Sequence, residues 1–275
     1  MLTHTFCHLQ GIGPAKEKQL WDKGITTWEK ALTGPDNLLQ KNKGHSSLIS
    51  ESIERLSQGD ATFFASRLPS SQQYRLFESF RKNAVFLDIE TTGLSPWDTI
   101  TTIALYDGNQ IRYYIQGQNL EQFSEDIQDY GLIITFNGKT FDLPFLRARL
   151  NIPLDHAHID LRYVLAGLGF KGGLKKCEKA MGLDRGDLDG VDGSFAVLLW
   201  HEYEKTGNEN ALETLLAYNI EDVINLETLM VRAFNMNTQE ISFTASIPEP
   251  EVMKNPLSPD MTLVDRLKSR ITAFW

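Results

Sequence analysis

Hydrophobic and polar positions follow two different periods along the chain. Short apolar runs with strand character occupy residues 84–89, 100–106, 111–115 and 132–136, whereas before residue 82 and after residue 160 apolar residues recur every three or four positions, which predicts helices. Asp107-Gly108-Asn109 joins the second and third runs and is typical of a hairpin turn. Strands that pair first as a hairpin and then alternate with helices predict a mixed sheet covered by helices.

Turn and cap residues mark where the expected helices begin and end. Pro14 suits the first position of a helix that stops near Gly24, and a threonine before Trp28 suits the N-cap of a short helix that ends near Gly34. Further helices are expected over residues 48–56, 72–80, 120–130, 143–150, 193–205 and 209–234.

The pattern divides the chain into three parts. Residues 1–82 are expected to form a small all-α domain and residues 83–235 an α/β domain. Residues 236–275 are rich in Asn, Ser, Glu and Pro, so an extended tail closed by a short amphipathic helix around Leu263–Phe274 is expected. The sequence contains no internal repeat.

The formal net charge of −9 argues, taken alone, against binding to nucleic acid. The charge is unevenly distributed, however: residues 1–82 carry 11 Lys and Arg against 8 Asp and Glu, a net +3, which leaves −12 for the remainder. An acidic body still suits a phosphate-containing substrate if some carboxylates hold divalent cations.

The chain has no apolar run near the roughly 18 residues of a membrane span, and its start does not resemble a signal peptide. A cytoplasmic location is therefore expected. Cys7 and Cys177 lie far apart and form no C-x-x-C pair, so they are expected to be reduced, structural thiols.

Two carboxylates end the first strand, in V-F-L-D-I-E-T-T-G-L. Asp88 and Glu90 are two residues apart and project from one face, with Leu87 and Ile89 on the other. Two ionised carboxylates this close repel each other unless a cation lies between them. A single D-x-E is more often a solvated strand end, so the metal hypothesis requires further acids nearby.

Two later segments supply candidate acids. Asp142 directly precedes a helix, and alone it would be interpreted as an N-cap, just as Asn137-Gly138 would be interpreted as a turn. Tyr218 and Asp222 are four residues apart and share a helical face. Glu221 points about 100° away from Asp222 around the helix, so Asp222 is the better candidate.

D-I-E-T-T-G (88–93), N-G-K-T-F-D-L-P-F-L (137–146) and Y-N-I-E-D (218–222) resemble the three motifs of the DEDD superfamily of 3′→5′ exonucleases. The tyrosine resembles the DEDDy branch, and residues 160–183 resemble stand-alone bacterial members. The resemblance covers about residues 84–234. It implies a ribonuclease H-like fold, with a mixed five-stranded sheet flanked by helices, which here follows a small all-α domain.

This resemblance implies an enzyme that hydrolyses the 3′ ends of single-stranded DNA or RNA, DNA being favoured, with two Mg²⁺ or Mn²⁺ ions. Asp88 would bridge both ions, Glu90 and Asp222 would hold the ion that carries the attacking water, and Asp142 would serve the leaving-group ion. Tyr218 would orient the water, because a phenol with an ordinary pKa near 10 is a poor base. Neither a membrane nor an obligate protein partner is expected.

The resemblance also implies substrate contacts. The terminal nucleotide would meet Thr91, Thr92, Gly93 and Leu94, with Leu94 against its base, and the strand would pass Asn137 and Phe141. Gly172-Gly173 is more often a simple turn, but a helix start there, with Lys175, would suit a phosphate.

The segment L-Q-G-I-G-P (9–14) looks like a helix-hairpin-helix hairpin, which would hold a DNA phosphate through main-chain N–H groups around Gly11 and Gly13. A hairpin that only packs against protein fits the residues about as well.

Other function classes fit less well. A catalytically silent nucleic-acid-binding module would not need the full set of acids and the tyrosine, and an RNase H-type endonuclease does not predict Y-x-x-x-D. An ATPase would need a glycine-rich phosphate loop that the chain lacks.

His156-Ala157-His158-Ile159-Asp160 has metal-ligand spacing, although histidines beside a strand usually only form hydrogen bonds.

Overall fold

The structure is a computed structural model that describes residues 1–33, 43–95, 97–184, 193–251 and 253–272. Its five-stranded sheet has the order β3-β2-β1-β4-β5, with β1 antiparallel to β2 and parallel to β4. The strands are β1 (Ala84–Thr91), β2 (Ile100–Tyr106), β3 (Ile111–Ile115), β4 (Leu132–Thr135) and β5 (Ala157–Asp160). The mixed five-stranded sheet is therefore confirmed. The pattern had not assigned β5, because its residues, Ala157-His158-Ile159-Asp160, do not form a continuous apolar run like that of β4.

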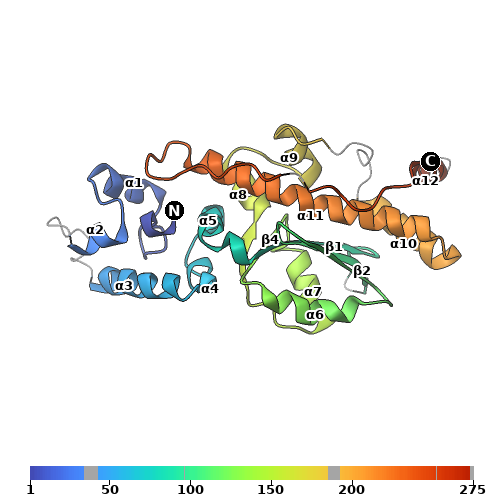
Figure 1. Cartoon of the computed structure of the whole chain (residues 1–275), viewed down its shortest axis with the longest axis horizontal. Helices are drawn as coiled ribbons and strands as arrows, with labels where there is room; N and C mark the ends of the chain where they lie inside the picture. Colours follow the sequence, from blue (N-terminus) through green and yellow to red (C-terminus); the bar gives the residue numbers. More distant parts are fainter. Residues whose placement is uncertain (34–42, 96, 185–192, 252, 273–275) are drawn as a thin grey trace.

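Strand β1 is central and buried on both faces. Val85, Leu87 and Ile89 pack into the core under α6 (Phe123–Asp126) and α7 (Asp142–Leu150), while Phe86 belongs to the core on the side of α11 (Glu209–Thr238). Figure 1 shows α11 lying along one face of the sheet and α6 and α7 across the other. Asp88 and Glu90 share one face of β1, as predicted, and the structure shows that this is the face covered by α11.

Helix α11 is the longest element, with 30 residues, and follows α10 (Gly193–Thr206). The side chain of Asn208 caps its start by accepting a hydrogen bond from Asn210 N at 3.2 Å. Leu212, Leu216 and Ile220 lie on its buried stripe, and the helix continues to Thr238, four residues past the expected end. None of the helices that the structure describes, α11 included, is both long and apolar enough to cross a membrane.

The segment expected as one helix over residues 120–130 is divided into three short turns, which corrects the prediction. These are η4 (Leu120–Gln122), α6 and η5 (Ile127–Asp129). Phe123 and Ile127 are fully buried, so the apolar spacing correctly identified the inward face. Leu120, Phe123 and Ile127 are three and four residues apart, a spacing that fits one α-helix and a succession of short turns alike, so the spacing alone did not determine the helix type.

The N-terminal region is helical, as expected. Helix α1 (Pro14–Asp22) begins at the predicted proline, and α2 (Trp28–Thr33) is capped by Thr27, whose Oγ1 accepts from Lys30 N at 3.2 Å; Gly34 lies outside the described residues. The expected 72–80 helix is instead a 3₁₀ turn followed by a short α-helix. The remaining elements are η1 (Leu2–His4), α3 (Lys43–Ser57), α4 (Ala61–Ala65), η2 (Ser70–Arg75), α5 (Leu76–Phe80) and η3 (Arg81–Asn83).

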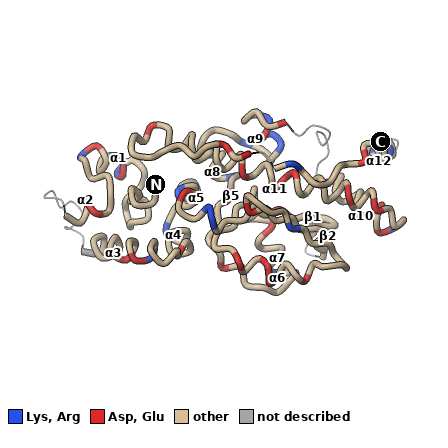
Figure 2. Tube along the Cα trace, in the orientation of Figure 1, with Lys and Arg blue, Asp and Glu red and all other residues tan. Residues whose placement is uncertain are grey.

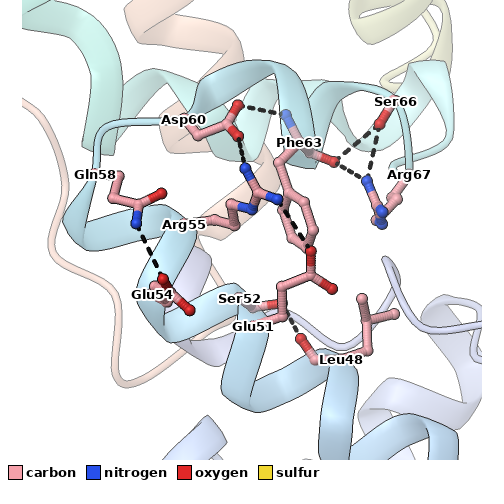
Figure 3. Close-up of polar contacts among 10 residues, drawn as sticks. All are labelled: Leu48, Glu51, Ser52, Glu54, Arg55, Gln58, Asp60, Phe63, Ser66 and Arg67. Atoms are coloured by element: carbon pink, nitrogen blue, oxygen red, sulfur yellow. Dashed lines mark hydrogen bonds and ion pairs between the residues drawn. The ribbon is translucent and has the colours of Figure 1, made fainter.

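The corner between α3 and α4 is held by Arg55, which contacts Glu51 on α3 and Asp60 at the start of α4 (Figure 3). Asp60 caps α4 by accepting from Phe63 N at 2.9 Å. The guanidinium groups of Arg55 and Arg67 lie 5.6 and 3.9 Å from the centre of the Phe63 ring. These contacts fix the direction in which the chain turns towards the sheet.

The N-terminal helices and the sheet share one continuous apolar core, which runs from Met1 through Phe64 and Phe86 to Phe234. A buried ion pair reinforces this region: Arg75 Nη1 lies 2.7 Å from Glu17 Oε2, and Glu17 Oε1 also accepts from the backbone N of Phe6 and Cys7. The domain boundary at residue 82 stays a prediction.

After α11 the chain runs back along that helix in a largely extended conformation (Figure 1). Ile247 exchanges two backbone bonds with the Asn235 amide, Asn255 Nδ2 donates to Ala217 O at 2.8 Å, and Asp260 N donates to Thr214 Oγ1 at 2.9 Å. The closing helix α12 (Met261–Thr272) shares an apolar cluster with α10 and α11. Phe274 lies outside the described residues.

Helix α8 (Leu161–Gly167) follows β5 and contacts it, and α9 (Leu174–Ala180) comes next along the chain. In Figure 2, α9 lies above α11 and carries basic residues, drawn in blue. Strand β1 ends at Thr91, at one edge of the sheet. This edge is where the candidate residues converge.

Candidate functional site

Three carboxylates meet between the end of β1 and the middle of α11. Asp88, Glu90 and Asp222 each offer one oxygen, and the three oxygens lie within 4.8 Å of one another. Glu90 and Asp222 are buried, so their mutual repulsion is weakly screened by water. Hard carboxylate oxygens at this spacing fit a divalent cation such as Mg²⁺ or Mn²⁺. The structure thus brings together three of the four acids that the sequence indicated.

Asp142, the fourth acid, is the first residue of α7 and lines the same pocket. Burial and the charge of Asp88 raise the pKa of Asp142 well above its usual range, against the opposing effect of backbone N–H groups of Asp142 and Ile89. Asp142 therefore lies close enough to be influenced by Asp88, but it stands outside the compact trio.

The pocket has a volume of about 470 Å³. Its walls include most of the residues expected to contact substrate. Those that line it are Thr91, Gly93, Leu94, Asn137 and Phe141, and Tyr218, which was expected to orient the attacking water, lines it as well. Thr92 is not among the lining residues and instead braces the loop after β1, where its hydroxyl donates to Asp98 at 3.0 Å.

Tyr218 is buried in the pocket wall, and Lys175 Nζ lies 4.8 Å from the centre of its ring. The starts of α9 and α10 complete this wall with Leu174, Gly193, Ser194 and Val197. Sequence reasoning missed these four residues, because nothing in their local pattern indicates that the two helix starts meet at the pocket.

Asn219 is a further residue that sequence reasoning missed. Its Nδ2 donates to Asp88 Oδ2 at 2.7 Å, and its Oδ1 accepts from Thr102 Oγ1 on β2 at 3.0 Å. Asn219 is fully buried. A signal was present, since an amide inside the apolar stripe of α11 and next to Tyr218 needs a polar partner.

The turn at Asn137 is fixed by Asp160. The carboxylate of Asp160 accepts from the backbone N of Asn137 at 2.8 Å and of Lys139 at 3.1 Å, and Asn137 has a left-handed φ of 69°. Arg162 Nη1 donates to the side-chain oxygen of Asn137. This arrangement holds Asn137 at the pocket edge.

The two histidines beside β5 are accounted for by hydrogen bonds within the fold. His158 Nε2 lies 2.9 Å from Thr135 Oγ1, and His156 Nε2 lies 3.1 Å from Ile127 O. Burial lowers the pKa of His158 to about 3. Among the described residues, the only group of three or more potential metal ligands is the carboxylate trio.

Glu221, the neighbour of Asp222, points away from the trio and accepts from Asn255 Nδ2 at 3.2 Å. The choice of Asp222 over Glu221 therefore agrees with the geometry. At the start of α9, Gly172 has a φ of +126°, a conformation that explains this glycine as a turn residue.

The glycine turn of the N-terminal region lies outside the acidic pocket. Gly11 and Gly13 line a separate open groove together with Arg67, and Gly11 has a φ of +76°. Helix α1 follows the turn, whereas the residues before it form only the short 3₁₀ helix η1. The helix-hairpin-helix interpretation stays a prediction.

Neither cysteine belongs to the pocket, and both are free and buried. Burial, and secondarily the charge of Glu17, raises the pKa of Cys7 to about 12. A thiol that stays protonated at neutral pH is a poor nucleophile, which agrees with the expected structural role.

One comparison with known proteins supports this fold. A family model described as the RNase H superfamily matches residues 85–234. Among solved structures, the family B DNA polymerase from the hyperthermophilic archaeon Pyrobaculum calidifontis is similar with a TM-score of 0.36 and 16% identity, over 62% of this chain and 31% of the polymerase. The chain thus spans about a third of that protein, and no curated protein matches significantly. Because the family model covers more than half of the sequence, the chain belongs to the RNase H superfamily.

Proposed function

We propose that the chain is a divalent-metal-dependent 3′→5′ exonuclease that hydrolyses phosphodiester bonds at the 3′ end of single-stranded nucleic acid, DNA in preference to RNA. The observation that carries the proposal is the convergence of Asp88, Glu90 and Asp222 in one pocket that Asp142 and Tyr218 also line. Membership of the RNase H superfamily supports nuclease chemistry in general. The 3′→5′ direction and the DEDDy assignment rest on the three motifs.

Asp88, Glu90, Asp142 and Asp222 would hold two Mg²⁺ or Mn²⁺ ions. The bound ions would supply the stabilisation of the attacking and leaving oxygens and would lower the pKa of the attacking water. Carboxylates held close together on a strand and two helices are organised before the substrate arrives, which reduces the reorganisation needed during the reaction. Burial, and secondarily the charge of Asp88, raises the pKa of Asp142.

Tyr218 would orient the attacking water through its hydroxyl group, and the packing that buries this side chain restricts its rotation. Leu94, Asn137 and Phe141 would hold the terminal nucleotide, and a pocket of about 470 Å³ lies within the size range of small-ligand sites. Lys175, beside the Tyr218 ring, would favour a phosphate at this end of the pocket.

The groove around Gly11 and Gly13 would provide a second, sequence-independent contact with a DNA phosphate. Arg67 lines this groove and is held by hydrogen bonds from its Nη1 to Phe63 O and Ser66 Oγ, at 3.0 and 3.2 Å. A guanidinium fixed in this way suits a phosphate oxygen.

The test uses single-stranded DNA and RNA oligonucleotides of one sequence, labelled at either the 5′ or the 3′ end, with Mg²⁺, Mn²⁺ or a chelator. We expect 5′-labelled DNA to shorten stepwise and 3′-labelled DNA to release labelled mononucleotide at once. Chelator should abolish both products. Asp88→Ala and Asp222→Asn should lower the rate by about 100-fold or more, because each removes several kcal/mol of transition-state stabilisation.

Glu221→Gln is the matched control, because Glu221 is adjacent to Asp222 on α11 but points away from the trio. It should retain nearly full activity. Binding of the oligonucleotide without degradation under any metal would instead support a catalytically silent binding module. Internal cleavage products would contradict the exonuclease assignment.

A further inference from the structure

The loop between β1 and β2 exposes two large apolar side chains. Leu94 is 84% exposed and Trp97 is 89% exposed, whereas the other exposed large hydrophobic residues among the described part of the chain are only 37–45% exposed. Single exposed apolar residues are common on protein surfaces. Two of this size on one loop, with Leu94 also lining the acidic pocket, require a separate explanation.

The exposure is not the result of a loose connection. The carboxylate of Asp98 accepts from Thr92 Oγ1 at 3.0 Å and from Ser95 N at 2.6 Å, and Thr92 N donates to Thr99 O at 2.9 Å. These bonds close the base of the loop. The loop that exposes Trp97 to solvent is therefore held in place by hydrogen bonds at its base.

Gly93 is required for this brace. A Cβ atom added at Gly93 would lie 2.6 Å from Asp98 Oδ2 and 2.9 Å from Asp98 Cγ. Only a residue without a side chain lets the Asp98 carboxylate reach across the loop. Gly93 therefore leaves room for the Asp98 carboxylate, which holds the loop that carries Trp97.

The chemistry of the loop identifies the kind of ligand. Residues 91–99, T-T-G-L-S-P-W-D-T, contain an aspartate and neither lysine nor arginine, so the loop offers no cation to a phosphate. An indole ring offers a flat surface on which nucleobases of any sequence stack. In a duplex the base faces are already covered by neighbouring pairs, and only an unpaired strand leaves them free.

We propose that Leu94 and Trp97 form a stacking surface for the unpaired bases next to the 3′ end of the substrate, and that Trp97 is a determinant of single-strand selectivity. This inference rests on the proposed function. It adds that recognition by the loop between β1 and β2 is directed at bases rather than at phosphates.

The test is a thermodynamic cycle that combines the substitution of Trp97 with the removal of bases from the oligonucleotide. Binding of the full chain to a fluorescent single-stranded DNA is measured by anisotropy with Ca²⁺ in place of the reactive metal. A second oligonucleotide has the same backbone but abasic residues at its last four positions. Trp97→Ala should weaken binding to the ordinary oligonucleotide by about 5- to 100-fold and leave binding to the abasic one within about twofold. Trp97→Phe should recover most of the affinity.

Tyr113→Ala is the matched control, because Tyr113 is an exposed aromatic residue on β3 that does not line the pocket. It should bind both oligonucleotides like the wild type. An equal loss on ordinary and abasic DNA, or no loss on either, would overturn the stacking inference. If the wild-type protein did not hydrolyse single-stranded DNA with Mg²⁺ or Mn²⁺, that result would contradict the proposed function rather than the stacking inference.

Discussion

The side-chain amide of Asn219 donates a hydrogen bond to Asp88, from Nδ2 to Oδ2 at 2.7 Å. Its orientation is set from the other side, because Thr102 Oγ1 donates to Asn219 Oδ1 at 3.0 Å. A flipped amide would place its oxygen against the carboxylate and its nitrogen against the hydroxyl. Strand β2 therefore fixes, through helix α11, the direction of a carboxylate on strand β1.

Asn219→Ala is expected to weaken Mn²⁺ binding by about 10- to 100-fold, because residues that orient metal ligands typically contribute this much. Isothermal titration with Mn²⁺ alone measures the affinity, and the Mn²⁺ concentration at half-maximal activity provides a second value. Excess metal should restore much of the rate. Thr102→Val, which removes only the hydroxyl donor, should cause a smaller loss in the same direction.

Asn225→Ala is the matched control for this prediction. Asn225 is also buried on α11 and donates to a buried carboxylate, that of Glu178, at 3.0 Å. Both substitutions remove one buried amide–carboxylate bond and should lower stability by similar amounts. If Asn225→Ala lowered Mn²⁺ affinity as much as Asn219→Ala, the effect would come from general destabilisation of the helix.

Gly93→Ala is expected to destabilise the β1–β2 loop by about 1–3 kcal/mol, because the new methyl group would overlap the Asp98 carboxylate. Exonuclease activity should fall with it. In an Asp98→Ala background, where the overlap is absent, the same substitution should cost much less. Urea unfolding of the four proteins gives the coupling energy, and strictly additive effects would exclude this contact as the cause.

Arg75→Met is expected to destabilise the chain by about 3–5 kcal/mol at neutral pH, because it leaves the buried carboxylate of Glu17 without its ion-pair partner. The double variant Glu17→Gln/Arg75→Met should recover much of this loss, since a glutamine oxygen can still accept from the backbone N of Phe6 and Cys7. Urea unfolding measures both. A double variant no more stable than Arg75→Met would show that Arg75 contributes mainly through packing.

Acid should destabilise the fold partly through His8. Burial, assisted by the charges of Arg67 and Arg75, lowers the pKa of His8 from 6.5 to about 4. Between pH 4 and pH 6.5 the unfolded chain binds more protons than the folded chain, because His8 is protonated only in the unfolded chain. The free energy of unfolding is therefore not reduced by His8 above about pH 6.5, and it falls as the pH decreases towards 4. The full loss is about 3 kcal/mol.

His8→Gln should reduce the fall in unfolding free energy between pH 7 and pH 4 by a comparable amount, as measured by urea unfolding at a series of pH values. His201→Gln is the control, because His201 is an exposed residue of α10. An unchanged pH profile in His8→Gln would mean that other titratable groups, and not His8, account for the acid sensitivity.

Sequence patterns predicted the elements that have a long apolar pattern or a distinctive residue at one end. The buried run of β1, the proline at the start of α1 and the apolar stripe of α11 were each sufficient to assign type and approximate limits. The short turns over residues 120–129 and strand β5 were not assigned correctly, because a few residues of apolar spacing suit several hydrogen-bonding patterns.

The sequence by itself determined that Asp88 and Glu90 share a face, because side chains two apart on a strand always do. It also determined that Tyr218 and Asp222 share one, because a helix repeats every 3.6 residues. Only the tertiary structure decided that these two faces meet, that Asn219 and Thr102 join them, and that Trp97 remains in solvent. Periodicity fixes direction within one element, whereas contact between elements depends on how the whole core packs.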